Sequence, residues 1–198
     1  MQPVTAILTA AGESVRMGMP KPLLAWRGVT LIEYQIAQLL EAGVSEVVVV
    51  LGHRHEDVSG YVAGPGVRVV VNHDYRRGKT TSIIMGVTAA GPEAGDLLFL
   101  GVDQPCPSAV TRRLIEAHRR TEALITAPFN GGQRGHPNIF SGTLYGELVS
   151  VTDAGQGIRE VIARHKDEVN AVEFDDDVVH LDLNMPLDYE EAKKRFGA

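Results

Sequence analysis

The chain has 198 residues, of which 44% are hydrophobic and 22% charged, and its net charge is −6. One domain over residues 1–198 is expected, because a chain of this length can bury a substantial core. The negative net charge argues against non-specific binding to nucleic acid. The only cysteine, Cys106, excludes an intrachain disulfide and a cysteine-based zinc site.

The N-terminal residues lack the charged and apolar regions of a secretion signal, and no apolar run is long enough to span a membrane. Together with the single cysteine, this predicts a protein of the reducing cytoplasm that has no membrane partner.

The first predicted strand runs into the loop LTAAGESVRMGMPKPLL at residues 8–24. Gly12 and Gly18 would let backbone N–H groups approach a phosphate, and Arg16 and Lys21 would neutralise its charge. An ordinary basic loop is the alternative. The spacing does not fit a P-loop, and the dinucleotide fingerprint G-x-G-x-x-G is absent from the chain. We therefore expect a phosphate-binding loop of another kind.

Further along the chain, runs rich in Val, Ile and Leu alternate with helix-like stretches. This alternation predicts an α/β fold with a doubly wound, mostly parallel sheet covered on both faces. Such sheets bind ligands beyond the carboxyl ends of their strands. The predicted strands are Val4–Leu8, Glu46–Leu51, Val67–Val71, Leu97–Leu100 and Leu124–Ala127, and the predicted helices are Leu31–Ala42, His55–Val62, Thr81–Ala90 and Ser108–Arg120.

The last third of the chain is less regular. Gly131, Gly132, Gly135 and Pro137 predict a small hairpin insertion within residues 129–140. The remaining predicted elements are helices at Leu144–Val149, Ile158–Arg164 and Glu190–Phe196 and strands at Ala171–Phe174 and Val178–Leu183.

Carboxylates near predicted strands are candidates for a metal site. Asp103 follows a strand and precedes a helix, so it would either hold Mg²⁺ or cap the helix. Ser108 is itself a candidate cap, which favours the metal role. Asp182 and Asn184 alternate with leucines and would share one strand face. That face would complete the metal site or be simply polar and exposed.

Other residues carry weaker signals. His53 and His55 suggest a metal pair, but no third ligand is nearby in the sequence, so polar residues at a helix start are favoured. Cys106 near Asp103 is expected to be a small buried residue. Trp26 is expected to pack near the first loop.

Six motifs in a fixed order resemble a known family. They are AAGESVRMGMPK, VVVVLGH, VVNHDYRRGKTTSIIMG, LGVDQP, GQRGHPNIF and LDLNMPLDY. The set resembles the nucleoside-triphosphate transferases that make dinucleotide forms of the molybdenum cofactor, and is most similar to the cytidylyltransferase branch. The resemblance covers residues 4–189 and implies a Rossmann-like nucleotidyltransferase fold.

The resemblance also implies three groups of site residues, among which Arg16, Lys21 and Asp103 would be catalytic. Asp103 would bind the metal, with Asp182 or Asn184 as a second ligand. The nucleotide would contact Leu8, Ala10, Ala11, Gly12, Arg16, Gly18, Lys21, Gly52, Asn72, Gly78 and Ser82. The pterin acceptor would lie near Gln133, Gly135, His136 and Pro137.

The implied reaction is Mg²⁺-dependent transfer of CMP from CTP to molybdopterin, or to its molybdenum-loaded form, with release of pyrophosphate. A molybdoenzyme apoprotein is a further expected partner. The acceptor phosphate is largely ionised at neutral pH, because its second pKa is about 6. The reaction therefore needs positioning and charge neutralisation rather than a general base.

Four alternatives stay open. GTP could replace CTP, or the acceptor could be another phosphorylated compound, such as a sugar phosphate or phospholactate. An oxidoreductase is disfavoured, because the dinucleotide fingerprint is missing. A protein that only binds or delivers the finished cofactor would have no need for Lys21 and Asp103.

Overall fold

A central β-sheet organises the computed structural model, which describes residues 2–121 and 123–197. The strand order is β10-β7-β9-β6-β1-β4-β5, and β8 pairs with β7. The strands are β1 (Val4–Ala10), β4 (Glu46–Leu51), β5 (Val67–Val71), β6 (Asp96–Gly101), β7 (Ile125–Asn130), β8 (Gln133–Arg134), β9 (Asn138–Phe140) and β10 (Val169–Glu173).

Most neighbouring strands are parallel, which confirms the predicted fold class. β1 pairs in parallel with both β4 and β6, whereas β9 is antiparallel to β6 and β7. Successive side chains of β1 enter different hydrophobic clusters, because strand side chains alternate between the two faces. Ile7 packs on one face of the sheet, and Ala6 and Leu8 pack on the other.

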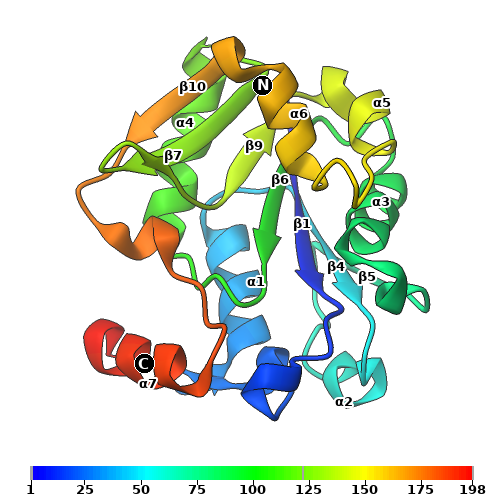
Figure 1. Cartoon of the computed structure of the whole chain (residues 1–198), viewed down its shortest axis with the longest axis vertical. Helices are drawn as coiled ribbons and strands as arrows, with labels where there is room; N and C mark the ends of the chain where they lie inside the picture. Colours follow the sequence, from blue (N-terminus) through cyan, green and yellow to red (C-terminus); the bar gives the residue numbers. More distant parts are fainter. Residues whose placement is uncertain (1, 122, 198) are drawn as a thin grey trace.

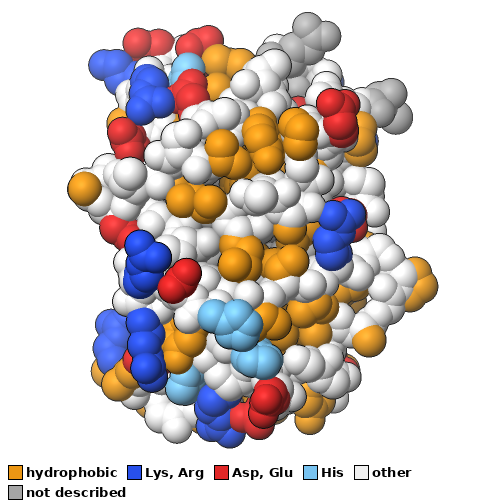
Figure 2. All heavy atoms as spheres, turned by 90° about the vertical axis from the view of Figure 1, so that its right-hand side faces the viewer, with side chains coloured by type: hydrophobic (Ala, Val, Ile, Leu, Met, Phe, Trp, Pro, Cys, Tyr) orange, Lys and Arg blue, Asp and Glu red, His pale blue; other side chains and the backbone are white. Residues whose placement is uncertain are grey.

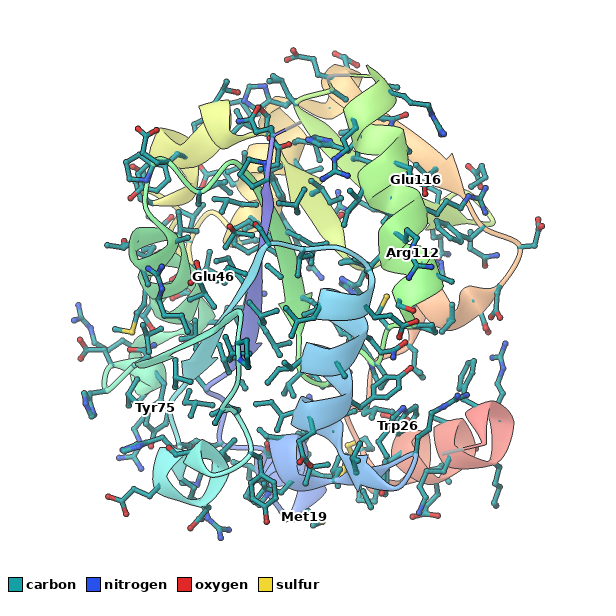
Figure 3. All side chains as sticks on the ribbon, turned by 180° about the vertical axis from the view of Figure 1, so that it is seen from behind. Met19, Trp26, Glu46, Tyr75, Arg112 and Glu116 are labelled. Carbon is teal, nitrogen blue, oxygen red and sulfur yellow. The ribbon has the colours of Figure 1, made fainter. Side chains whose placement is uncertain are left out.

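Helices cover both faces (Figure 1). One face packs against α1 (Leu31–Glu41) and α4 (Ser108–Thr121), which stand in front of the sheet in Figure 3. The other packs against α3 (Lys79–Ala90), α5 (Tyr145–Leu148) and α6 (Ile158–Arg164). The remaining α-helices are α2 (His55–Ser59) and α7 (Pro186–Phe196). Within the described ranges, no helix has the length and apolar character to cross a membrane.

The small hairpin β2 (Ala25–Trp26) and β3 (Val29–Thr30) was not predicted. It leads into α1 through a capping box in which Thr30 and Glu33 bond reciprocally. Trp26 of this hairpin is buried, with ring centroids 6.2 Å from Tyr34 and 6.5 Å from Tyr189. Figure 3 shows Trp26 between α1 and α7. The hairpin therefore attaches α7 to the rest of the molecule.

One prediction for the last third needs correction. The strand predicted at Val178–Leu183 is wrong: residues Asp177–His180 form a 3₁₀ helix, and residues 181–185 are not in a strand. The backbone N–H of Leu183 donates to the Asp103 carbonyl at 2.8 Å, so the segment lies along the loop after β6. The predicted hairpin is present as β7–β8, and the next strand, β9, enters the main sheet between β6 and β7.

The parallel strands β1, β4 and β6 end at the same edge of the sheet, at the bottom of Figure 1. The loop after β1, helix α2 and helix α7 surround this edge (Figure 1). Such an edge is where open α/β sheets bind ligands.

Candidate active site

The loop after β1 folds back on itself. Ser14 and Gly18 have positive φ angles of 55° and 74°, and the N–H of Gly18 donates to the Ser14 carbonyl at 3.2 Å. The Ser14 hydroxyl accepts a hydrogen bond from the backbone N–H of Lys21 at 3.1 Å. Gly18 therefore shapes the turn, and this turn returns Lys21 to the end of β1.

Four polar side chains meet at this loop. Lys21 Nζ lies 2.8 Å from Asp103 Oδ2 and 3.3 Å from Asn184 Oδ1. Arg16 reaches the same Asn184 oxygen at 3.5 Å. The Lys21 side chain is 12% exposed and that of Asp103 is 30% exposed, so their ion pair is partly shielded from water. The loop after β1, the loop after β6 and the segment before α7 thus converge on one ammonium group.

The oxygens of Asp103 and Asn184 fit a magnesium ion. Both are hard donors and already face one cationic group, the ammonium of Lys21. In the described part of the chain, no three His, Cys, Asp or Glu side chains converge as a metal site. A magnesium ion here would therefore complete its shell with water and substrate phosphate, which is its usual preference.

Asp182 has different contacts. Its Oδ1 accepts from Gln104 Nε2 at 2.9 Å, and its Oδ2 lies 3.8 Å from His136 Nε2. Asp182 and Asn184 do lie near one site, but as part of an irregular segment and not of a strand face. Of the two proposed second ligands, Asn184 is the one that shares Lys21 with Asp103.

Asp103 does not cap α4. Its carboxylate pairs with Lys21, while Gln38 Oε1 of α1 accepts from the backbone N–H of Ser108 at 2.8 Å. The expected cap by Ser108 is replaced by this contact between helices. Asp103 lies within a turn that Gln104 closes: the Gln104 Oε1 accepts a hydrogen bond from the backbone N–H of Gly101 at 2.9 Å.

Residues at the ends of neighbouring strands pack close to the loop after β1 and to the start of α3. Gly52, at the end of β4, touches the loop so closely that an added Cβ would lie 2.6 Å from the Ala11 carbonyl oxygen. Asn72 is buried, and its Nδ2 donates to Thr81 and Ser82 at 2.8 and 2.9 Å. The structure therefore places Asn72 behind Ser82, which itself lines the cleft.

The segment after β8 forms the opposite wall of the site. The N–H of Gly135 donates to the Pro128 carbonyl, and the N–H of His136 donates to the Val179 carbonyl, both at 2.8 Å. Burial lowers the pKa of His136, against the opposing effect of the Asp182 and Asp103 carboxylates. His136 is therefore a neutral imidazole near pH 7, able to accept or donate a hydrogen bond.

These elements enclose a cleft of about 630 Å³, a typical size for a small-molecule site (roughly 300–1,000 Å³). Ten predicted site residues line it: Ala10, Ala11, Gly12, Arg16, Lys21, Ser82, Asp103, Gly135, His136 and Asn184. Eight do not: Leu8, Gly18, Gly52, Asn72, Gly78, Gln133, Pro137 and Asp182.

The residues outside the cleft have identifiable positions. Leu8 is fully buried in the core cluster beneath α1 and α4, and Pro137 is also buried. Gln133 is exposed on β8. Gly78 lies against Asp153, whose Oδ2 would be 1.8 Å from an added Cβ. For Leu8, burial leaves no surface that could touch a nucleotide.

Several cleft residues were missed. Arg134 and Asn138 flank the GHP element, so the motif itself contained the signal, whereas Arg159 had none. His53 and His55 form no joint metal site: His53 bonds the Tyr75 hydroxyl at 3.2 Å, whereas the ring of His55 stacks edge-on against a different histidine. Figure 2 shows histidine side chains gathered on this part of the surface. Cys106 is buried, as expected.

Comparison with known proteins gives a consistent result. The family model of the MobA-like NTP transferase domain matches residues 6–169. The chain is 28% identical to molybdenum cofactor cytidylyltransferase of Escherichia coli K12, over 99% of this chain and 98% of that protein. It is 32% identical to nicotine blue oxidoreductase of Paenarthrobacter nicotinovorans, over 91% and 92%.

A solved structure has the same fold over nearly all of both chains. Rv0371c from Mycobacterium tuberculosis H37Rv superposes with a TM-score of 0.83 at 29% identity, covering 96% of each chain. A second structure of that protein was solved as a complex with manganese and superposes with a TM-score of 0.79 at 27% identity, over 96% of this chain and 97% of that one.

Proposed function

Because this chain belongs to the MobA-like NTP transferase family of nucleotidyltransferases, we propose that residues 1–198 form one domain that transfers CMP from CTP to molybdopterin. The observation that carries the proposal is the position of Lys21, whose ammonium lies at the cleft between the Asp103 and Asn184 oxygens. Magnesium is the proposed metal, and the cytoplasm is the expected place of the reaction.

The cations of the first loop suit a triphosphate. The planar guanidinium of Arg16 can bind two phosphate oxygens at once. The ammonium of Lys21 is a point charge, and its attraction to the pyrophosphate grows as negative charge develops on that leaving group. A magnesium ion on Asp103 and Asn184 supplies further positive charge to the phosphates when bound. Ala11 and Gly12 line the same cleft as these cations.

The acceptor is proposed to enter from the wall that carries His136. Its ionised phosphate attacks the α-phosphorus of CTP, so one new P–O bond forms while the bond to pyrophosphate breaks. No proton has to be removed from an ionised phosphate, so the reaction needs no base, and the proposed role of His136 is to orient the acceptor by a hydrogen bond.

CTP is preferred over GTP because of the similarity to the cytidylyltransferase. The test is pyrophosphate release with Mg²⁺, molybdopterin and each of CTP, GTP, ATP and UTP. We expect release with CTP. Faster release with GTP would mean that the protein transfers GMP. No release with any of the four nucleotides would exclude molybdopterin as the acceptor. Any release would also exclude a delivery-only role.

The relative named an oxidoreductase supports a second candidate, reduction of an organic substrate. Oxidation of reduced nicotinamide nucleotide by the purified protein, with no pyrophosphate release under any condition, would favour it. We expect no such oxidation, because the chain lacks the dinucleotide fingerprint.

A further inference from the structure

One polar side chain lies in the apolar stripe of α1. Gln35 is 0% exposed, and the residues four positions before and after it, Leu31 and Leu39, are buried in the hydrophobic core. A buried amide is costly unless its N–H groups and its oxygen find hydrogen-bond partners. The place of Gln35 in the core therefore depends on what its side chain binds.

The Gln35 side chain makes hydrogen bonds to the backbone of the loop after β6. Its Nε2 donates to the Gln104 carbonyl at 2.7 Å and to the Gly101 carbonyl at 3.3 Å, and its Oε1 accepts from the backbone N–H of Cys106 at 3.2 Å. These partners assign the amide orientation, since a reversed amide would place its oxygen against two carbonyl oxygens. The amide thus spans this loop from one end to the other.

Asp103 lies inside the turn that Gln35 holds. The backbone N–H of Gln104 donates to the Gly101 carbonyl at 3.1 Å, which closes the turn, and Gln35 binds the carbonyls of both residues. The Asp103 carbonyl accepts from the N–H of Leu183 at 2.8 Å. The backbone that carries the Asp103 carboxylate is therefore held by contacts from two distant parts of the chain.

The residues after the turn have few backbone donors. Residues 105 and 107 are prolines, which lack an N–H group. Cys106 between them therefore supplies the only backbone donor of this short stretch, and Gln35 accepts it. The conformation of the loop thus depends on a side chain of α1 and cannot come from the loop's own backbone alone.

We propose that Gln35 is a positioning residue: by holding the turn after β6, it keeps the Asp103 carboxylate in place to bind a metal together with Asn184. A ligand that is already in place binds a metal more tightly, because less conformational entropy is lost on binding. The inference rests on the proposed function only in that Asp103 binds the metal. It does not depend on which nucleotide or acceptor reacts.

Metal binding can be measured without nucleotide or acceptor. The probe is Mn²⁺ alone, and electron paramagnetic resonance follows its free concentration during titration of the wild-type protein and its variants. Gln35→Met keeps the approximate volume of the side chain but removes its hydrogen bonds to the loop. We expect this variant to weaken Mn²⁺ binding by roughly tenfold, the lower end of the effect of residues that orient metal ligands. Asp103→Asn should weaken it by at least as much.

A double-mutant cycle separates positioning from a general structural role. If Gln35 acts through the Asp103 carboxylate, Gln35→Met should have no further effect on Mn²⁺ affinity in a protein that already carries Asp103→Asn. A loss by the same factor in both backgrounds would overturn the inference, as would an unchanged affinity in Gln35→Met alone.

A second variant covers the case in which Gln35→Met does not fold. Gln35→Asn keeps the amide but is one methylene group shorter, so it cannot reach all of the same backbone partners. We expect weaker Mn²⁺ binding in this variant too, again without further effect in the Asp103→Asn background. An unchanged affinity in Gln35→Asn would then overturn the inference.

The matched control is Gln38→Met. Gln38 lies on the same helix, and its Oε1 accepts from the backbone N–H of Ser108, beyond the turn that holds Asp103. Its replacement removes a hydrogen bond between α1 and the same chain segment, so it should lower the free energy of unfolding in urea and leave Mn²⁺ affinity unchanged. Equal losses of Mn²⁺ affinity in Gln38→Met and Gln35→Met would overturn a specific role of Gln35.

Failure of this inference differs from failure of the proposed function. If the cycle shows the expected coupling but no pyrophosphate is released from any nucleotide, the role of Gln35 stands and the transfer reaction is wrong. If pyrophosphate is released and Gln35→Met binds Mn²⁺ as tightly as wild type, the reaction stands and the role of Gln35 is wrong. No Mn²⁺ binding by the wild type, or equal binding by wild type and Asp103→Asn, would overturn the role of Gln35 together with the metal site.

Discussion

At the scale of single residues, the central feature is that the two oxygens proposed to hold a metal are already bound to a lysine. Lys21 is paired with Asp103 and Asn184, the same two side chains that fit magnesium. A metal and an ammonium cannot occupy one position, because like charges at that distance repel strongly. Metal binding is therefore expected to release Lys21 toward the phosphates, at a place where the triphosphate needs a second cation.

The first prediction concerns Lys21. Lys21→Gln removes a charge that stabilises the leaving pyrophosphate, and a loss of such a group costs roughly 10²–10³-fold in kcat. Pyrophosphate release under saturating CTP and acceptor is the measurement. Lys194→Gln is the matched control, since Lys194 is exposed on α7. A kcat within threefold of wild type, a change in the activation barrier on the order of 0.6 kcal/mol, would show that Lys21 has no catalytic role.

The second prediction concerns Asp103. Asp103→Asn replaces the ionised ligand with a neutral amide, so magnesium should bind more weakly while the loops keep their shape. We expect the Mg²⁺ concentration that gives half-maximal pyrophosphate release to rise at least tenfold, about 1.4 kcal/mol. A magnesium titration at fixed CTP measures it. An unchanged midpoint would mean that the metal is held elsewhere.

Sequence reasoning found Lys21 and Asp103 because each follows a strand whose end can be located from its apolar run. It missed Arg134 and Asn138, although both lie inside a recognised motif and line the cleft. Which side chains of a motif face a cleft depends on three-dimensional packing, and no sequence pattern records it.

At the scale of elements, the walls of the cleft are held by close backbone contacts. Gly135 lies against the 3₁₀ helix before α7, and an added Cβ would be 2.3 Å from the Val179 carbonyl oxygen. The same helix accepts the hydrogen bond from the N–H of His136. The position of the His136 wall therefore depends on a residue without a side chain.

The third prediction follows from this contact. Gly135→Ala should displace the wall, lowering the free energy of unfolding by about 1–3 kcal/mol, and it should raise the acceptor KM. Urea unfolding and initial rates measure the two effects. Gly146→Ala is the matched control, because its Cβ would meet no atom within 4 Å and it lies in α5. If the two variants had equal free energies of unfolding, the segment around His136 would accommodate the added methyl group without loss of stability.

Helices α5 and α6 are linked through a titratable pair. His165 Nε2 lies 2.9 Å from Glu147 Oε1, and His165 Nδ1 lies 3.1 Å from Glu168 Oε1. Hydrogen bonds to Glu168 and Glu147 raise the pKa of His165, and the bond from His165 lowers the pKa of Glu147. The contribution of His165 is therefore complete below its unfolded pKa of about 6.5 and is lost as pH rises through the folded value.

The fourth prediction uses that pH dependence. The lowered pKa of Glu147 means that its contribution is lost as pH falls through the folded value, so the pair stabilises most between about pH 5 and 6.5. His165→Gln should cost up to about 1 kcal/mol more at pH 6 than at pH 8, a small value because the pair is partly exposed. Urea unfolding at pH 6 and pH 8 measures this difference in unfolding free energy, and His73→Gln is the control because His73 is an exposed histidine. An equal loss of unfolding free energy at both pH values would show that protonation of His165 is not coupled to stability.

At the scale of the whole molecule, periodicity predicted the sheet well but not the path of the chain near its end. The apolar runs at β1, β4 and β6 lie in the interior of the sheet. A continuous apolar run there indicates a parallel strand that is buried on both faces. Residues 178–183 also alternate, yet the alternation arises because leucines pack inward beside the Asp103 loop. Alternation reports which side chains are buried, not whether the backbone pairs with a strand.

The last prediction concerns the cleft as the meeting point of the whole chain. Segments within residues 9–22, 79–83, 99–104, 134–138 and 156–162 all line it, so a bound nucleotide should stabilise the entire fold by mass action. At a ligand concentration of 100 Kd the gain is about 2.7 kcal/mol, which corresponds to roughly 5–10 °C in Tm for a chain of this size. Thermal unfolding with CTP and Mg²⁺ should show it.

Removal of the metal provides the decisive comparison. Chelation by EDTA should reverse most of the Tm gain, because the phosphates would then lack the metal's charge, and the Asp103 carboxylate would repel them. Asp103→Asn should make the CTP-induced shift less dependent on magnesium, since the repelling carboxylate is gone. A shift of equal size with and without EDTA in the wild type would mean that the nucleotide is bound by the loop alone, and that Asp103 and Asn184 serve only to hold Lys21.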